Sequence, residues 1–317
     1  MKALKRLISI LILLVCGFLI YTNFNSIVSY VDKLLDKGVD YINKTGLTLL
    51  DSDGSLISEK SKDSLEDSGI TGRDLAFEGV YYPYYTLITD NERLLYKQIY
   101  ANVVDYQTTF VPVTTSNINE VTNALEAVYN DHPELFWMDT SYSYKYYEDN
   151  TCAQIILKFN ETINYIDTAK ANFDNKVNSI INSANMYDSN YEKEKYVHNA
   201  ILNIVEYDVS APMNQTAYSA LVNGKTVCAG YARSFQYIMT KLEIPTYYVT
   251  GTAEEDHAWN IVKLSDGYYN VDLTWDDVKT NKYSYFNIED QKFSKTHTRT
   301  RMSVNLPTCN GNKYLNR

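Results

Sequence analysis

A helix that carries a cysteine in its first turn is the feature that most constrains this chain. The stretch GKTVCAGYARSFQYIMTKLEIP covers residues 224–245. Its large apolar side chains recur at intervals of three and four, at Tyr231, Phe235, Ile238, Met239 and Leu242. This spacing predicts an amphipathic helix packed on a core, with a Gly-Lys turn before it and a closing proline after it.

Cys228 falls at the start of this predicted helix. The unpaired N–H groups and the dipole of a helix N-terminus favour an anion, and a thiolate is one. A sulfur held as the thiolate is the form that a nucleophile requires at neutral pH. A buried structural cysteine is the alternative, because Cys228 lies seven residues before Phe235, on the apolar stripe.

The segments after this helix predict an antiparallel hairpin. TYYVTGTA (246–253) and the run from His257 to Lys263 alternate as strands, and YYNVDLTW (268–275) returns after a Ser-Asp-Gly turn. If Ser265 and Asp266 form a two-residue turn, Leu264 pairs with Gly267.

In that register Asp272 lies across from Trp259 and one diagonal step from His257, on the same face and within side-chain reach. A turn one residue later widens the distance between His257 and Asp272, and a three-residue loop puts the two residues on opposite faces of the hairpin. The sequence leaves these registers open.

The first register predicts a catalytic triad. Cys228 is the nucleophile, His257 the general acid and base, and Asp272 the carboxylate that orients the imidazole. The backbone N–H of Cys228 is one expected oxyanion donor. Tyr218 and Trp259 are weaker candidates for oxyanion or substrate contacts, and a core position is the alternative for Tyr218.

Three blocks together resemble the transglutaminase-like superfamily of papain-like proteins: AYSALVNGKTVCAGYARSFQYI, DHAWNIVK and YYNVDLTWDD. The resemblance runs from about Asn190 to Tyr285. It implies a Cys-His-Asp triad at Cys228, His257 and Asp272, on an α+β core in which the cysteine helix packs on an antiparallel sheet. HPELFW and YVHNAILNIVEYD are similar to bacterial members that carry this domain at the cell surface.

The chain before this domain divides into four predicted segments. Residues 1–24 hold Lys2, Lys5 and Arg6 before an uncharged apolar run, which indicates a signal anchor or, second, a cleaved signal peptide. Residues 25–50 predict an amphipathic stalk helix, and 51–74 a flexible polar linker. A helical and β N-terminal region follows at 75–185, and the transglutaminase-like domain is expected at 186–317. We therefore expect a single-pass membrane protein with an extracytoplasmic domain, or a secreted protein if the signal is cleaved.

The expected activity is cysteine-dependent acyl transfer on protein or peptide amides, by transamidation or hydrolysis. A catalytically inactive surface module that binds peptide or wall polymer is the main alternative, and a zinc site is a distant third. We expect no cofactor or metal. The net charge of −10 argues against a nucleic-acid partner. His132 is expected at a helix end, His198 on a helix flank and His297 in the charged C-terminal segment. We expect no catalytic role for these three histidines.

Overall fold

The computed structural model describes residues 69–147, 149–278 and 282–315. The predicted signal segment and stalk helix lie outside these residues, as does most of the predicted linker. Among the described residues, no helix is long and apolar enough to cross a bilayer. This finding contradicts the predicted single-pass localisation, and it gives no support to the predicted membrane partner.

The first described layer, here called the N-terminal layer, packs helices on a small sheet. The sheet is antiparallel with strand order β1-β3-β2. Its elements are α3 (Pro83–Leu87), α4 (Asp90–Val104), β1 (Thr109–Phe110), α5 (Ile118–Asp131), β2 (Met138–Tyr146) and β3 (Cys152–Phe159). Asn117 caps α5. The Asn117 side chain accepts the Asn119 and Glu120 N–H groups, and Glu120 binds back to the cap, which forms a capping box.

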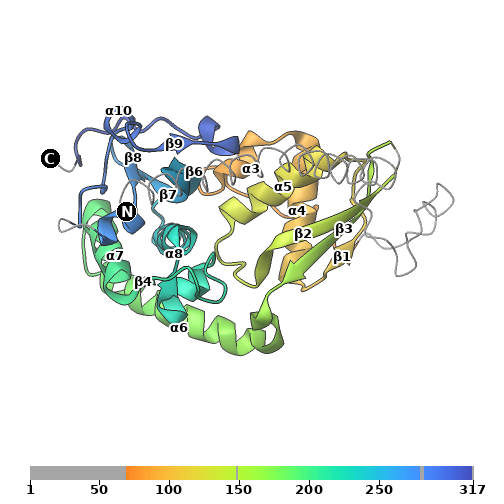
Figure 1. Cartoon of the computed structure of the whole chain (residues 1–317), viewed down its shortest axis with the longest axis horizontal. Helices are drawn as coiled ribbons and strands as arrows, with labels where there is room; N and C mark the ends of the chain where they lie inside the picture. Colours follow the sequence, from red (N-terminus) through yellow and green to blue (C-terminus); the bar gives the residue numbers. More distant parts are fainter. Residues whose placement is uncertain (1–68, 148, 279–281, 316–317) are drawn as a thin grey trace, which may run out of the picture.

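The second part, here called the α8 core, surrounds one buried helix. Figure 1 shows α8 in the middle of this part, with α6 and α7 on one side and strands β6, β7 and β8 on the other. Its helical elements are η1 (Glu161–Tyr165), α6 (Ile166–Ala184), α7 (Asn190–Ile204), η2 (Ser219–Asn223), α8 (Cys228–Lys241), α9 (Leu273–Asp277), α10 (Asp290–Phe293) and η3 (Arg301–Asn305). Its fold is α+β, as the sequence predicts.

The strands of the α8 core form two sheets. β4 (Glu206–Tyr207) and β5 (Lys225–Thr226) make a short parallel pair directly before α8. The larger sheet is antiparallel with order β8-β7-β6-β9. Its strands are β6 (Thr246–Ala253), β7 (Glu255–Leu264), β8 (Gly267–Val271) and β9 (Thr298–Arg299). The domain boundary predicted between residues 185 and 186 stays a prediction. Helix α6, which ends just before it, packs against α7 and α8.

Burial explains why α8 forms where it does. Tyr231, Phe235, Ile238 and Met239 are completely buried, as the apolar stripe predicts. The helix ends at Lys241, before the predicted stop at Pro245.

The β7–β8 hairpin adopts the first of the predicted registers, in which Leu264 pairs with Gly267. The return strand is shorter than predicted, since β8 ends at Val271. Asp272 instead caps α9, because its Oδ1 accepts the Trp275 N–H at 3.1 Å. Aspartate is a strong N-cap residue, so a helix begins where the alternating pattern predicts more strand.

Candidate active site

Cys228 is the first residue of α8, and its side chain is partly exposed. It packs against a small buried cluster that includes Val227, Ala232, Tyr248 and Ala258. Val227 caps the helix through its backbone alone, without a side-chain hydrogen bond. The first N–H groups of a helix have no acceptor inside it, so the Cys228 sulfur lies beside potential donors to an anion.

His257 and Asp272 are in direct contact. His257 Nε2 lies 2.8 Å from Asp272 Oδ2, and the carboxylate is completely buried. With Nε2 on the carboxylate, Nδ1 is the ring nitrogen left for the Cys228 side chain, which also hydrogen-bonds to His257. The three side chains of the predicted triad therefore meet in one chain of contacts.

A second histidine binds the same carboxylate oxygen, and the sequence did not predict it. His297 Nε2 lies 3.1 Å from Asp272 Oδ2, and its Nδ1 lies 2.8 Å from the Thr296 hydroxyl. The His297 ring is buried and stacks on Phe293 with centroids 3.9 Å apart. The sequence placed His297 in a charged C-terminal segment, but the residue is buried.

Close packing of β9 against β6 places His297 beside Asp272. β9, which begins at the next residue, pairs with β6 at Gly251 and Thr252. A Cβ atom at Gly251 would collide with the carbonyl oxygen of Thr298 and with the Trp259 ring. Glycine is therefore required for β9 to approach β6 so closely.

The electrostatics of the site follow from these contacts. Burial opposes a charge on His257, but the hydrogen bonds that the ring donates to Asp272 and Cys228 outweigh this effect and raise the pKa of His257 to about 10. Burial likewise opposes a charge on Asp272, yet the hydrogen bonds from His257 and His297 hold the pKa of this carboxyl below its usual value. At neutral pH the arrangement therefore favours an imidazolium between a carboxylate and a sulfur.

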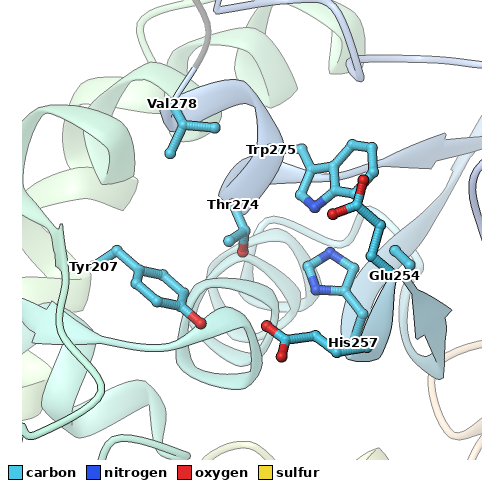
Figure 2. Close-up of a pocket in the computed structure, with 8 residues that line it drawn as sticks. Tyr207, Glu254, His257, Thr274, Trp275 and Val278 are labelled. Carbon is cyan, nitrogen blue, oxygen red and sulfur yellow. The ribbon is translucent and has the colours of Figure 1, made fainter. Parts of the chain in front are cut away.

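A cavity of about 610 Å³ opens at His257. Figure 2 shows His257, Trp275 and Glu254 on one side, with Tyr207 pointing its hydroxyl into the cavity from the other. Thr274 also lines the cavity, and its buried hydroxyl has no hydrogen-bond partner among the described residues. The cavity gives a substrate group access to the imidazole.

Tyr207 is a site residue that the sequence analysis missed. It pairs with Thr226 in the β4–β5 ladder, two residues before Cys228. Burial, together with electrostatic interaction with Cys228 and Glu255, raises the pKa of Tyr207. α7 ends at Ile204, so Tyr207 lies in the short strand that follows the helix.

The two weaker predicted site residues do not face the cavity. Tyr218 is buried, and its ring stacks on Phe136 with centroids 4.8 Å apart. Trp259 is 1% exposed and donates its indole N–H to Asn270 at 3.2 Å. Both are core residues. For Tyr218, a core position was the alternative prediction.

The other histidines and cysteines are also buried. His132 ends α5 and binds Glu134 at 2.7 Å, and His198 binds Asp276 at 3.0 Å. His198 is thus in the core, not on a helix flank. Cys152, Cys228 and Cys309 are all free thiols, and burial raises the pKa of Cys152 to about 12 and the pKa of Cys309 well above its usual value.

His257, Asp272 and His297 place their ligand atoms within 4.8 Å of one another, as a metal site would. The N···O distances of 2.8 and 3.1 Å are those of hydrogen bonds, which account for the arrangement without an ion.

Comparison with known proteins agrees with this geometry. The family model of the transglutaminase-like superfamily matches residues 174–273, which include Cys228, His257 and Asp272. Kyphoscoliosis peptidase of Homo sapiens is 29% identical over 140 residues, an alignment that covers 37% of this chain and 21% of the human protein. The match thus spans about a fifth of that relative's length.

Two solved structures are also similar. One is a TGase at 16% identity and a TM-score of 0.30, covering 60% of this chain and 55% of the other. The other is a candidate cysteine protease from Cytophaga hutchinsonii at 17% identity and a TM-score of 0.30, covering 43% and 62%. Residues 174–273 of this chain thus match the transglutaminase-like superfamily.

Proposed function

We propose that this protein is a cysteine-dependent acyl-transfer enzyme that acts on carboxamide or peptide groups of proteins or peptides through a thioester on Cys228. The observation that carries the proposal is the 2.8 Å contact between His257 and the buried Asp272, beside a cysteine at a helix N-terminus and a cavity. A core cysteine needs none of these neighbours.

The first half of the proposed reaction forms the thioester. The Cys228 sulfur attacks the carbonyl carbon of the amide, and a C–S bond forms as the carbonyl oxygen becomes an oxyanion. His257 donates its Nδ1 proton to the nitrogen of the leaving group, and the C–N bond breaks. The pKa of about 10 for His257 keeps this proton available at neutral pH.

The second half releases the acyl group. His257, now neutral, accepts a proton from an amine or from water as that nucleophile attacks the thioester carbonyl. The C–S bond breaks, and the thiolate and imidazolium are restored. Asp272 stays ionised throughout and holds Nε2, so the ring keeps the orientation that both proton transfers require.

Two groups are placed to stabilise the oxyanion. The N–H groups in the first turn of α8 have no acceptor within the helix. Tyr207 replaces Tyr218 as the side-chain candidate, because its hydroxyl points into the cavity (Figure 2).

The cavity rim suits an amine as the acceptor. Glu254 and Glu255 carry carboxylates there, and Trp275 and Tyr207 offer aromatic faces. Carboxylates and aromatic faces attract a cationic ammonium group, whereas water gains nothing from them. We therefore propose transamidation as the main outcome, with hydrolysis as its slower competitor.

The test is product analysis with the full chain. A glutamine-containing peptide library is incubated with the protein and a primary amine, and the products are identified by mass spectrometry. We expect amine incorporation at glutamine, with ammonia released and a lesser amount of deamidated peptide.

Cys228→Ser is the matched control for chemistry, and Cys152→Ser is the control for a buried thiol elsewhere. Product that persists in Cys228→Ser, or an absence of any product from the folded wild type, contradicts the proposal. Peptide binding without product would instead support the inactive binding module.

A further inference from the structure

A second hollow lies between the N-terminal layer and the α8 core. It measures about 250 Å³ and is walled by α5, the start of β2, β6 and the residue that begins η3. Its lining is mainly apolar and aromatic, and includes Leu125, Tyr129, Met138, Tyr142 and Tyr248. The hollow is distinct from the cavity at His257, with which it shares no lining residue.

This hollow continues toward the start of α8. A neighbouring hollow of about 220 Å³ shares Met138, Asp139 and Thr140 with it and is closed on its other side by the 213–216 loop. The carbonyl oxygen of Asn214 in that loop accepts the Val227 N–H at 3.2 Å, one residue before Cys228. The two hollows share a wall and are here together called the trough, and the loop that closes it is hydrogen-bonded to the residue before Cys228.

The floor of the trough is close to the sulfur. Tyr248 packs in the same small cluster as Cys228. Burial is the main cause that raises the pKa values of Tyr129 and Tyr248, and electrostatic interaction with Cys228 adds to both. Arg233 holds Tyr129 in place. Its guanidinium lies 3.8 Å from the Tyr129 ring centroid and donates a hydrogen bond to the Tyr129 carbonyl oxygen.

Two polar atoms of the trough have no partner among the described residues. They are the Oε1 atom of Glu126, an acceptor, and the Nδ2 atom of Asn130, a donor. Asn130 is 1% exposed, and an unpaired buried amide is costly. The two residues are four apart on α5, so their side chains lie about 6 Å apart along one helix face.

Both atoms are buried under the lining, so the Glu126 and Asn130 side chains would turn toward a bound peptide to pair with its backbone. An extended peptide presents a backbone N–H and a C=O to the same side at a repeat of about 6.7 Å, comparable to the spacing along α5. Its alternate side chains would then reach the aromatic floor.

We propose that this trough binds an extended segment of the acyl donor and selects a bulky apolar or aromatic side chain, which packs over Tyr129 and Tyr248. That the bound peptide is the acyl donor rests on the function proposed above. The N-terminal layer then supplies half of the specificity site through α5 and β2, while the α8 core supplies the chemistry.

The test measures binding without turnover. The full chain carrying Cys228→Ala is titrated with fluorescein-labelled heptapeptides that have a central glutamine, and anisotropy gives the Kd. Each flanking position is occupied in turn by Gly, Leu, Phe or Asp. We expect Phe or Leu at one position to bind about ten to a hundredfold more tightly than Gly there, as burial of one large side chain would give.

Two substitutions then fill the trough from opposite walls. Thr140→Trp acts from an exposed position at the start of β2, and Thr122→Trp from α5. Each is expected to reduce the preference to less than threefold. Ser141→Trp, on the same strand but outside the lining, is the matched control and is expected to keep it.

The proposal is refuted if the Cys228→Ala protein shows no side-chain preference. It is also refuted if the preference survives both filling substitutions in folded protein. Circular dichroism establishes that each variant is folded. The two proposals can fail separately. Selective binding without product in the amine assay refutes the proposed activity but supports the peptide-binding trough. Product without side-chain preference supports the activity but refutes the trough.

Discussion

Two buried histidine–aspartate pairs lie at the two ends of α9, and they differ in what surrounds them. Asp272 caps the helix and binds His257 at 2.8 Å, and Asp276, four residues later, binds His198 at 3.0 Å. His198 is completely buried against Tyr283 and Phe286, while His257 faces a cavity and Cys228. A His–Asp contact alone is therefore no sign of catalysis in this chain.

The two carboxylates also differ in charge. Burial raises the pKa of Asp276 in spite of its single histidine. Burial acts on Asp272 in the same sense, yet the hydrogen bonds from two histidines hold its pKa below the usual value. The comparison indicates that one imidazole does not offset the effect of burial on the pKa of Asp276, whereas two imidazoles do so for Asp272.

Removal of His257 gives the largest expected effect. His257→Ala deletes both proton transfers, and we expect kcat/KM for amine incorporation to fall by about 10²- to 10⁴-fold. Thermal unfolding should change little by comparison with the second pair. A variant that retains activity within threefold of wild type would break the contrast between the two pairs.

Removal of His198 should instead act on stability. His198→Phe leaves the completely buried Asp276 without the side chain that binds it at 3.0 Å, which costs about 2 kcal/mol of unfolding free energy. Urea denaturation at pH 7 measures the loss, and Asp276→Asn in the same chain should recover part of it. Activity per folded molecule should match wild type, and a hundredfold loss of kcat in folded His198→Phe would show that the second pair takes part in the reaction.

The pH dependence above neutrality tests the charge on His257. Its folded pKa of about 10 lies above the ordinary 6.5, so the imidazolium is fully present below pH 6.5 and is lost as the pH rises through about 10. We expect the acylation rate to fall about tenfold per pH unit beyond that point, because the leaving nitrogen no longer receives a proton. Initial rates between pH 7 and 11 measure this limb, and a fall centred near 6.5 would contradict the account.

The smallest expected effect concerns His297, which we regard as a positioning residue. His297→Phe keeps an aromatic ring but removes the donor to Asp272, so the carboxyl should become more like Asp276. We expect the acid limb of kcat/KM to move up by about one pH unit, whereas His297→Gln, which keeps a donor near the Nε2 position, should leave it in place. Equal shifts in both variants would reduce His297 to a packing role.

The groups around Asp272 allow that shift to be assigned. His257 and Cys228 approach from β7 and α8, and Asp276 and Tyr285 interact electrostatically from α9 and the loop after it. None of them changes between the two His297 variants, so a difference between Phe and Gln reports the lost hydrogen bond.

Local patterns predicted much of this site. The three- and four-residue spacing after Cys228 predicted α8, and the Ser-Asp-Gly turn left few registers for the hairpin, of which the observed one brings His257 to Asp272. These features depend on neighbours within one helix or one hairpin, where periodicity is informative.

The remainder depends on contacts that no local pattern encodes. His297 reaches Asp272 across 25 residues only because β9 packs onto Gly251. Tyr207 enters the cavity because a two-residue strand pairs with the segment before Cys228. The end of β8 at Val271 reflects competition between strand and helix cap at Asp272, which alternation alone could not resolve.

The most direct test of the central claim is the rate of Cys228 alkylation by iodoacetamide as a function of pH, read at each cysteine by mass spectrometry. A thiolate held by His257 predicts rapid labelling of Cys228 already at pH 6, no labelling of the buried Cys152 and Cys309 in folded protein, and a large loss of the pH 6 rate in His257→Ala. Labelling of Cys228 that is slow at pH 6 and identical in wild type and His257→Ala would contradict the account.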